Sequence, residues 1–145
     1  MTDNEPSIAI NDQFEPRTDQ SFLRRVVAAT LDYANRPEMP VSILLAGDRE
    51  IARLHAEFLD DPSPTDVISF EIDDGADLAV SVECARREAA RRGHDADAEL
   101  ALYVVHGLLH VCGYDDIDEE DRARMRVAER EVLASLSLHV SPVDE

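Results

Sequence analysis

The hydrophobic positions of the chain follow two periods, and these predict an alternation of strands and helices. Alternating or short apolar runs predict strands, which are expected over residues 7–11, 40–46, 67–72 and 78–80. Apolar residues three to four positions apart predict helices. One is expected to begin at Asp19 or Gln20 and another at Asp95 or Asp97, and Asp48, Ser81 and Asp118 are expected to cap three more. Interspersed strands and helices indicate an α+β or α/β fold, with a mixed four-stranded sheet and about five helices.

Length and composition fit one domain over residues 1–145. With 44% hydrophobic residues, the chain can bury a substantial core. The acidic ends, residues 1–6 and 139–145, are expected to fray. No apolar run reaches the roughly 20 residues of a membrane span, and the N-terminus lacks a secretion signal, which predicts a cytoplasmic protein. Two cysteines, Cys84 and Cys112, do not make a disulfide framework.

The most informative stretch runs from His106 to Asp116, His-Gly-Leu-Leu-His-Val-Cys-Gly-Tyr-Asp-Asp. Two histidines four apart on a helix project from the same face, so both imidazoles can reach one metal ion. Gly113 is expected to end the helix in the left-handed conformation and to turn the chain back. A third ligand would then come from Tyr114, Asp115 or Asp116.

The histidine pair is also compatible with roles that need no metal or a different chemistry. A pair at this spacing on an apolar helix also occurs for packing and hydrogen bonding alone. In the zinc peptidases the residue after the first histidine is the glutamate that acts as general base, and here it is Gly107. Cys112 is expected to point away from the histidine face and to pack as a small apolar residue.

The whole stretch resembles the signature H-G-x-L-H-x-x-G-Y-D-H of the YbeY family of bacterial rRNA maturation endoribonucleases. The resemblance continues in residues 64–70, Pro-Thr-Asp-Val-Ile-Ser-Phe, in residues 77–81, and at Met125, Glu129 and Leu133 in the last helix. It covers roughly residues 40 to 135. It implies an α+β domain with one Zn²⁺ near a cleft between the motif helix and the sheet. The metal-binding and catalytic residues would be His106, His110 and Asp116, the last at the position of a family histidine.

The resemblance also implies a function and partners. The family's activity is single-strand-specific, metal-dependent cleavage of RNA in the maturation of the 16S rRNA 3′ end and in ribosome quality control. Its partners would be rRNA and the small ribosomal subunit, together with ribosomal proteins and a ribosome-associated GTPase. Zn²⁺ in such a site lowers the pKa of water and polarises a phosphodiester oxygen.

Two departures from the family pattern bear on activity. Leu59 stands where the family has an arginine, and leucine can neither pair with a phosphate nor stabilise developing negative charge. Asp116 replaces a neutral ligand by a charged one and lowers the net charge of a zinc centre from about +2 to about +1. The alternatives are therefore a metal-binding ribosome assembly factor with little or no nuclease activity, and a metal-dependent hydrolase of another substrate.

Three further features can be interpreted either functionally or structurally. His55 precedes Leu59 by one helical turn, and a solvated surface histidine is the simpler interpretation. Asp66 and Ser69 flank a strand near the expected site, although Asp66 could also cap its own turn. The net charge of −18 opposes nucleic-acid binding, and all 14 basic residues are arginine. Arginines at 24–25, 86–87, 91–92 and 122–130 could form a local basic patch, or helix faces that pair with Glu88, Glu129 and Glu131.

Overall fold

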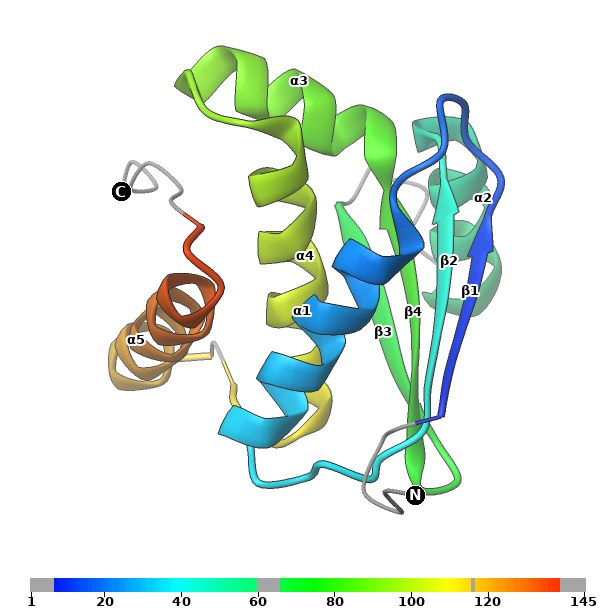
Figure 1. Cartoon of the computed structure of the whole chain (residues 1–145). Helices are drawn as coiled ribbons and strands as arrows, with labels where there is room; N and C mark the ends of the chain where they lie inside the picture. Colours follow the sequence, from blue (N-terminus) through cyan, green and yellow to red (C-terminus); the bar gives the residue numbers. More distant parts are fainter. Residues whose placement is uncertain (1–6, 60–65, 116, 139–145) are drawn as a thin grey trace.

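The computed structural model describes residues 7–59, 66–115 and 117–138, which form four strands and five helices (Figure 1). In chain order these are β1 (Ile8–Asp12), α1 (Gln20–Tyr33), β2 (Val41–Ala46), α2 (Asp48–Leu59), β3 (Val67–Ile72), β4 (Gly75–Ser81), α3 (Val82–Arg92), α4 (Ala96–Val111) and α5 (Glu119–Ser135). The termini expected to fray, residues 1–6 and 139–145, lie outside the described residues.

The four strands form one mixed sheet in the order β1-β2-β4-β3. β1 pairs with β2 and β2 pairs with β4 in parallel, whereas the hairpin of β3 and β4 is antiparallel. α1 and α4 cover one face of the sheet, α5 packs on the outside of α4, and α2 lies against the other face (Figure 1). The predicted α+β domain with a mixed four-stranded sheet and five helices is confirmed.

Local signals in the sequence set most element boundaries. Asp19, Ser81 and Asp118 each accept a hydrogen bond from a backbone N–H of the first helical turn, as N-cap residues do. α2 begins at Asp48 itself rather than after it. β4 is longer than expected and begins at Gly75. A Cβ at Gly75 would lie 2.7 Å from the carbonyl oxygen of Pro40, so only glycine lets the chain start the strand there.

The main core lies between the sheet and the layer of α1, α4 and α5. Its fully buried side chains include Leu23 and Val27 of α1, Ile43 and Leu45 of β2, and Leu108 and Leu109 of α4. A smaller cluster under α2 consists of Ala46, Ile51, Ile68 and Ala79. Residues 44–46 of β2 and 78–80 of β4 are thus covered on both faces and are apolar, whereas Ser42 in β2 is exposed and Asp77 in β4 is partly exposed.

α4 is buried on almost every side, because it touches α1, α3, α5, β3 and β4. Its closest approach to the sheet is at Gly107, where a Cβ would lie 2.9 Å from Cδ2 of Leu78 and 3.2 Å from Cγ2 of Val67. A side chain at position 107 would therefore push the helix away from the sheet. The glycine that follows the first histidine of the motif has a packing role.

A buried polar cluster fixes the other end of α4. The Glu99 carboxylate lies 2.6 Å from Nε2 of His94 and 3.6 Å from Nη1 of Arg92, and the Glu99 side chain is only 1% exposed. Burial, together with hydrogen bonds to Cys84 and Glu99, raises the pKa of Tyr103, one turn further along α4. Because a buried carboxylate is costly unless it is paired, these contacts hold the corner between α3 and α4 in one geometry.

Replacing Gly107 by valine should destabilise the fold by about 2 kcal/mol, because the new side chain overpacks against Leu78 and Val67. Helix propensity would favour valine over glycine by a few tenths of a kcal/mol, so a loss of stability reports the packing. Urea unfolding of the metal-free proteins measures it. Ala123→Val, on the exposed face of α5, is the control and should cost less than about 0.7 kcal/mol. Equal stability of Gly107→Val and the natural protein would contradict the close approach.

Candidate metal site at the end of α4

The motif helix α4 ends as predicted, in a left-handed glycine. Gly113 has φ +104°. Its N–H donates to the carbonyl of His110 at 3.1 Å, and the N–H of Tyr114 donates to the carbonyl of Leu109 at 2.9 Å. These two bonds make a Schellman motif, which closes the helix and reverses the chain. The turn therefore starts directly beside His110.

The His106 ring is hydrogen-bonded to a carboxylate of α5. Its Nδ1 lies 2.6 Å from Oε2 of Glu129, and the Glu129 side chain is 14% exposed. An ionised carboxylate only accepts hydrogen bonds, so Nδ1 carries the proton and Nε2 is the nitrogen with a lone pair for a metal. Metal-binding histidines commonly have such a carboxylate partner, which fixes the ring orientation.

The structure describes two of the three candidates for the third ligand. Tyr114 packs against the main core, and its ring centroid is 6.5 Å from that of Tyr33. The exposed Asp115 follows it. Asp116, the ligand that the family resemblance implies, lies outside the described residues. His110 is exposed at the last turn of α4.

Within the described ranges, no three His, Cys, Asp or Glu side chains are grouped closely enough to hold a metal. The side of α4 that meets the sheet is occupied by Gly107, and His106 faces α5 through Glu129. The Nδ1 side of the His106 ring therefore faces α5. The metal position expected from the resemblance, near a cleft between the motif helix and the sheet, stays a prediction.

Both cysteines behave as packing residues. Cys112 is half-buried against the main core, as predicted, and burial raises the pKa of its thiol. Burial likewise raises the pKa of Cys84, whose sulfur lies 3.6 Å from the Tyr103 hydroxyl. A raised pKa reduces the thiolate fraction, which is the form that binds metals. Both cysteines therefore pack mainly as protonated, apolar side chains.

A second polar cluster lies where β2 and β4 end. Asp48 accepts hydrogen bonds from the Ser81 hydroxyl at 2.6 Å and from Arg87 at 2.8 Å. Burial raises the pKa of Asp48, but these two bonds outweigh burial and the pKa is lowered overall. The backbone carbonyl of Asp66 accepts from the N–H of Ser81 at 2.9 Å. The cluster connects α2, α3 and the start of β3, so its bonds stabilise the fold.

Two more residues singled out in the sequence lie on α2, across the sheet from α4. His55 is half-buried, which differs from the solvated histidine that was expected. The side chain of Leu59, the last residue of α2, lies outside the described residues. The expectation that arginines pair with acidic neighbours is confirmed for Glu88, which contacts Arg91 and Arg92.

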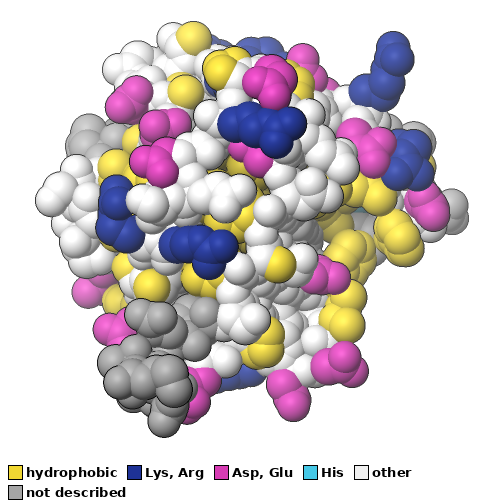
Figure 2. Space-filling model, turned by 45° about the vertical axis from the view of Figure 1, so that its right-hand side comes forward, with side chains coloured by type: hydrophobic (Ala, Val, Ile, Leu, Met, Phe, Trp, Pro, Cys, Tyr) yellow, Lys and Arg dark blue, Asp and Glu magenta, His cyan; other side chains and the backbone are white. Residues whose placement is uncertain are grey.

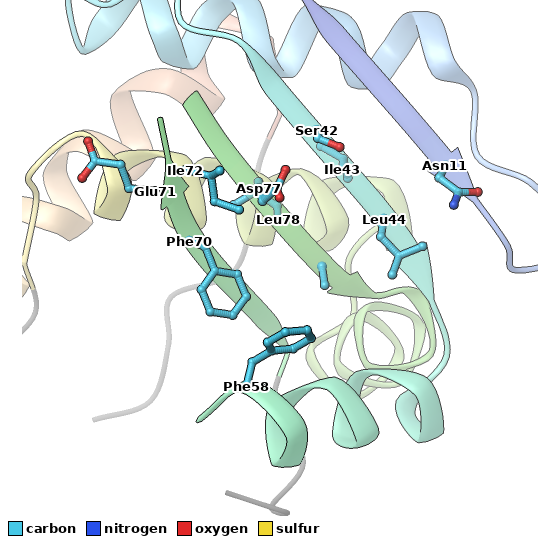
Figure 3. Close-up of a pocket in the computed structure, with 11 residues that line it drawn as sticks. Asn11, Ser42, Ile43, Leu44, Phe58, Phe70, Glu71, Ile72, Asp77 and Leu78 are labelled. Atoms are coloured by element: carbon cyan, nitrogen blue, oxygen red, sulfur yellow. The ribbon is translucent and has the colours of Figure 1, made fainter. Parts of the chain in front are cut away.

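A pocket of about 430 Å³ opens on the outer face of the sheet, beside α2 (Figure 3). Phe58 and Phe70 stand edge to face at one end, with ring centroids 6.0 Å apart, and Asp77 projects from the floor. Figure 2 shows hydrophobic side chains gathered around a hollow at the right of the view. Successive residues of a strand point to opposite faces of the sheet. The Leu78 side chain packs against Gly107 of α4, so the Asp77 side chain projects to the other face. The pocket and the histidine pair therefore lie on different sides of the sheet.

The sequence matches one protein family over most of its length. The model of the family described as Endoribonuclease YbeY matches residues 7–137. The chain belongs to the YbeY family. An Endoribonuclease YbeY from Heliobacterium modesticaldum is 34% identical, over 82% of this chain and 84% of the relative. Another from Roseiflexus castenholzii is 36% identical, over 87% of this chain and 89% of the relative.

The fold is also similar to a solved structure. A protein from Thermotoga maritima, determined in solution, superposes with a TM-score of 0.63 over 90% of this chain and 91% of that chain. Its sequence is 21% identical, so the likeness concerns the fold. No helix of the described residues is long and apolar enough to cross a membrane.

Glu129 is the residue whose role the sequence did not indicate. It matches a glutamate of the YbeY pattern, but the sequence is also compatible with a surface residue that pairs with nearby arginines. The structure places its carboxylate against His106, a residue 23 positions earlier in the chain. Only the packing of α5 on α4 brings the two together.

Proposed function

We propose that the chain is a zinc-dependent endoribonuclease that cuts single-stranded RNA in rRNA maturation, including the 16S rRNA 3′ end, and that acts in ribosome quality control. Its place would be the cytoplasm, on the small ribosomal subunit, among ribosomal proteins and a ribosome-associated GTPase. The observation that carries the proposal is the hydrogen bond between Glu129 and Nδ1 of His106, on a helix whose next turn carries His110. Membership of a family named for endoribonuclease activity supports the reaction type.

The donor set fits a zinc ion. Two imidazoles from consecutive turns of α4 and the carboxylate of Asp116 would be three protein ligands of the kind found in catalytic zinc sites. Glu129 holds the proton of His106 on Nδ1, so Nε2 is the ring nitrogen that would bind the metal. Bound Zn²⁺ supplies Lewis acidity, which activates water and polarises a phosphodiester oxygen.

The residues around the histidines fix the position of the candidate ligands and take no part in acid–base chemistry. The Schellman end at Gly113 turns the chain beside His110, and Asp118 caps α5 two residues beyond Asp116. The end of α4 and the beginning of α5, which flank the connection between the two helices, are therefore both anchored. Gly107 lets α4 pack closely against the sheet, and outside the core His106 is half-buried and His110 is exposed.

A second candidate function is a metal-binding ribosome assembly factor without nuclease activity. Two features favour it: Leu59 replaces the family arginine, and a net charge of −18 repels RNA. The two functions share the metal site and differ in the contacts to phosphate. Cleavage of RNA by the purified protein separates them.

The protein should purify with about one Zn²⁺ per chain. Changing both His106 and His110 to alanine should abolish the bound metal, Asp116→Ala should weaken its retention, and Asp116→His should retain it because imidazole is also a zinc ligand. Elemental analysis after gel filtration measures the occupancy. Cys112→Ser is the matched control and should keep its zinc. Equal metal in the natural protein and the double histidine variant would refute the site.

Glu129→Gln should weaken zinc binding about 10- to 100-fold, because a neutral amide oxygen accepts the Nδ1–H hydrogen bond of His106 more weakly than a carboxylate does. Competition with a chromogenic chelator gives the dissociation constant. Thermal unfolding of both metal-free proteins checks that the variant is folded. Glu131→Gln is the control, since Glu131 is on the same helix and bonds Tyr33 instead. An unchanged zinc affinity in Glu129→Gln would show that the bond does not orient a ligand.

Leu59→Arg should speed RNA cleavage, because the guanidinium can hold a phosphate bidentately, and one such contact is worth about 10²-fold or more in rate. Single-turnover cleavage of an rRNA fragment compares the two proteins at equal zinc content. If the natural protein is fast and the variant is no faster, another group already holds the phosphate. If neither cleaves, the assembly factor is the better description.

A further inference from the structure

The floor of the pocket on the outer face of the sheet carries one carboxylate in largely apolar surroundings. In the pairing of the strands, Asp77 of β4 lies between Ser42 of β2 and Phe70 of β3. Directly paired residues of neighbouring strands project to the same face of the sheet, so these three side chains form a row across it. Phe58 of α2 stands edge to face with Phe70 (Figure 3). A hydroxyl, a carboxylate and two aromatic rings thus meet in one pocket.

The Asp77 carboxylate has no partner among the described residues. Its side chain takes part in no hydrogen bond or ion pair there, and the described residues that line the pocket include no arginine or histidine. Other carboxylates, such as those of Asp48, Glu88 and Glu129, are paired. Glu71 also lines the pocket, but its side chain points away from the floor (Figure 3). The pocket therefore carries a negative charge that its own lining does not neutralise.

Apolar side chains surround this charge and are themselves incompletely covered. Phe58 is 59% exposed and Ile72 is 50% exposed, although both are large hydrophobic residues. Leu44 and Phe70 are half-buried against the small cluster under α2. A ligand that covers the pocket would remove apolar surface from water in addition to meeting the carboxylate. The pocket therefore fits a ligand that has both an apolar part and a positive charge.

The alternatives fit this chemistry less well. An RNA strand brings phosphates, which Asp77 and the net charge of −18 repel. A wholly apolar ligand would bury the Asp77 carboxylate without a partner, which is costly. A cation on an apolar stem meets both features, because it pairs with the carboxylate and is attracted to the faces of aromatic rings. Arginine fits better than lysine, since its planar guanidinium can form two parallel bonds to a carboxylate and stack on a ring.

We propose that this pocket binds an arginine side chain of a basic polypeptide. The guanidinium pairs with Asp77 and lies against the Phe70 ring, and apolar parts of the same polypeptide cover Phe58 and Ile72. These two exposed residues offer more apolar surface than a small free cation can cover, which favours a polypeptide. The net charge of −18 promotes encounters with a basic partner. The proposal goes beyond the nuclease function and gives the chain a protein-binding face across the sheet from the histidine pair.

The test measures binding of a short fluorescein-labelled peptide of alternating arginine and glycine to the full-length protein, followed by anisotropy at physiological salt. A second peptide carries citrulline in place of arginine, which keeps the shape of the side chain and removes its charge. The natural protein should prefer the arginine peptide. Asp77→Asn should reduce this preference about 10-fold, because the amide cannot form the charge-assisted bonds of the carboxylate.

The matched control is Asp74→Asn, which removes the same charge from the exposed turn between β3 and β4, outside the pocket lining. It should leave the preference within about twofold, because salt screens an exposed charge. Phe58→Leu keeps an apolar side chain but removes a ring, and it should weaken binding of the arginine peptide about 2- to 5-fold more than binding of the citrulline peptide. Thermal unfolding should show that all three variants are folded like the natural protein.

Four results would each overturn the proposal. Equal losses in Asp77→Asn and Asp74→Asn would show that the peptide responds only to the net charge. Equal binding of both peptides by the natural protein would show that no cation is recognised. If single-stranded RNA loses affinity in Asp77→Asn and the arginine peptide does not, the pocket serves nucleic acid. If the natural protein dimerises in gel filtration and Asp77→Asn does not, a second copy of the chain fills the pocket.

Discussion

The contact of α4 with the sheet at Gly107 is the constraint on which the rest of the structure depends. Because no Cβ fits against Leu78 and Val67, the helix axis lies close to the strands and α4 is covered on nearly all sides. With Gly107 against the sheet, the preceding residue His106 projects toward α5. The same packing that builds the core thus decides which surface the motif histidines face.

Polar groups at both ends of α4 keep that geometry. At the beginning, the buried Glu99 is paired with His94 and lies near Arg92, which ties α4 to the end of α3. At the end, the two bonds of the Schellman motif and the Asp118 cap set a short reversal into α5. Loss of the His94 contact would leave the buried Glu99 charge unpaired, and loss of the Schellman bonds would leave backbone carbonyls without donors. Distorting either end of α4 would therefore cost free energy of folding. The histidines are therefore carried on a rigid element.

The net charge of the molecule does not by itself give the local charge at each part of its surface. Most carboxylates form a surface that repels polyanions, and several arginines are neutralised by neighbours such as Glu88 and Asp48. At the beginning of α5, the Arg122 side chain donates to the backbone carbonyl of Ile117. The apolar pocket with Phe58 and Phe70 lies on the opposite face of the sheet. The two faces thus have different chemistry.

The sequence by itself determined the parts that depend on short-range interactions. The period of apolar residues predicted the helices and strands, the caps at Asp19, Ser81 and Asp118 and the left-handed Gly113 were readable, and the motifs led to the YbeY family. All of these rest on contacts between residues a few positions apart or on the pattern of one segment.

Only the tertiary structure decided which distant groups meet. The partnership of His106 with Glu129, the close approach at Gly107, the burial of Glu99 and the start of β4 at Gly75 all depend on how elements pack. A glutamate on an amphipathic helix looks the same in sequence whether it faces solvent or an imidazole. Its environment is set by the distance and rotation between two helices, and these follow from the packing of the whole core.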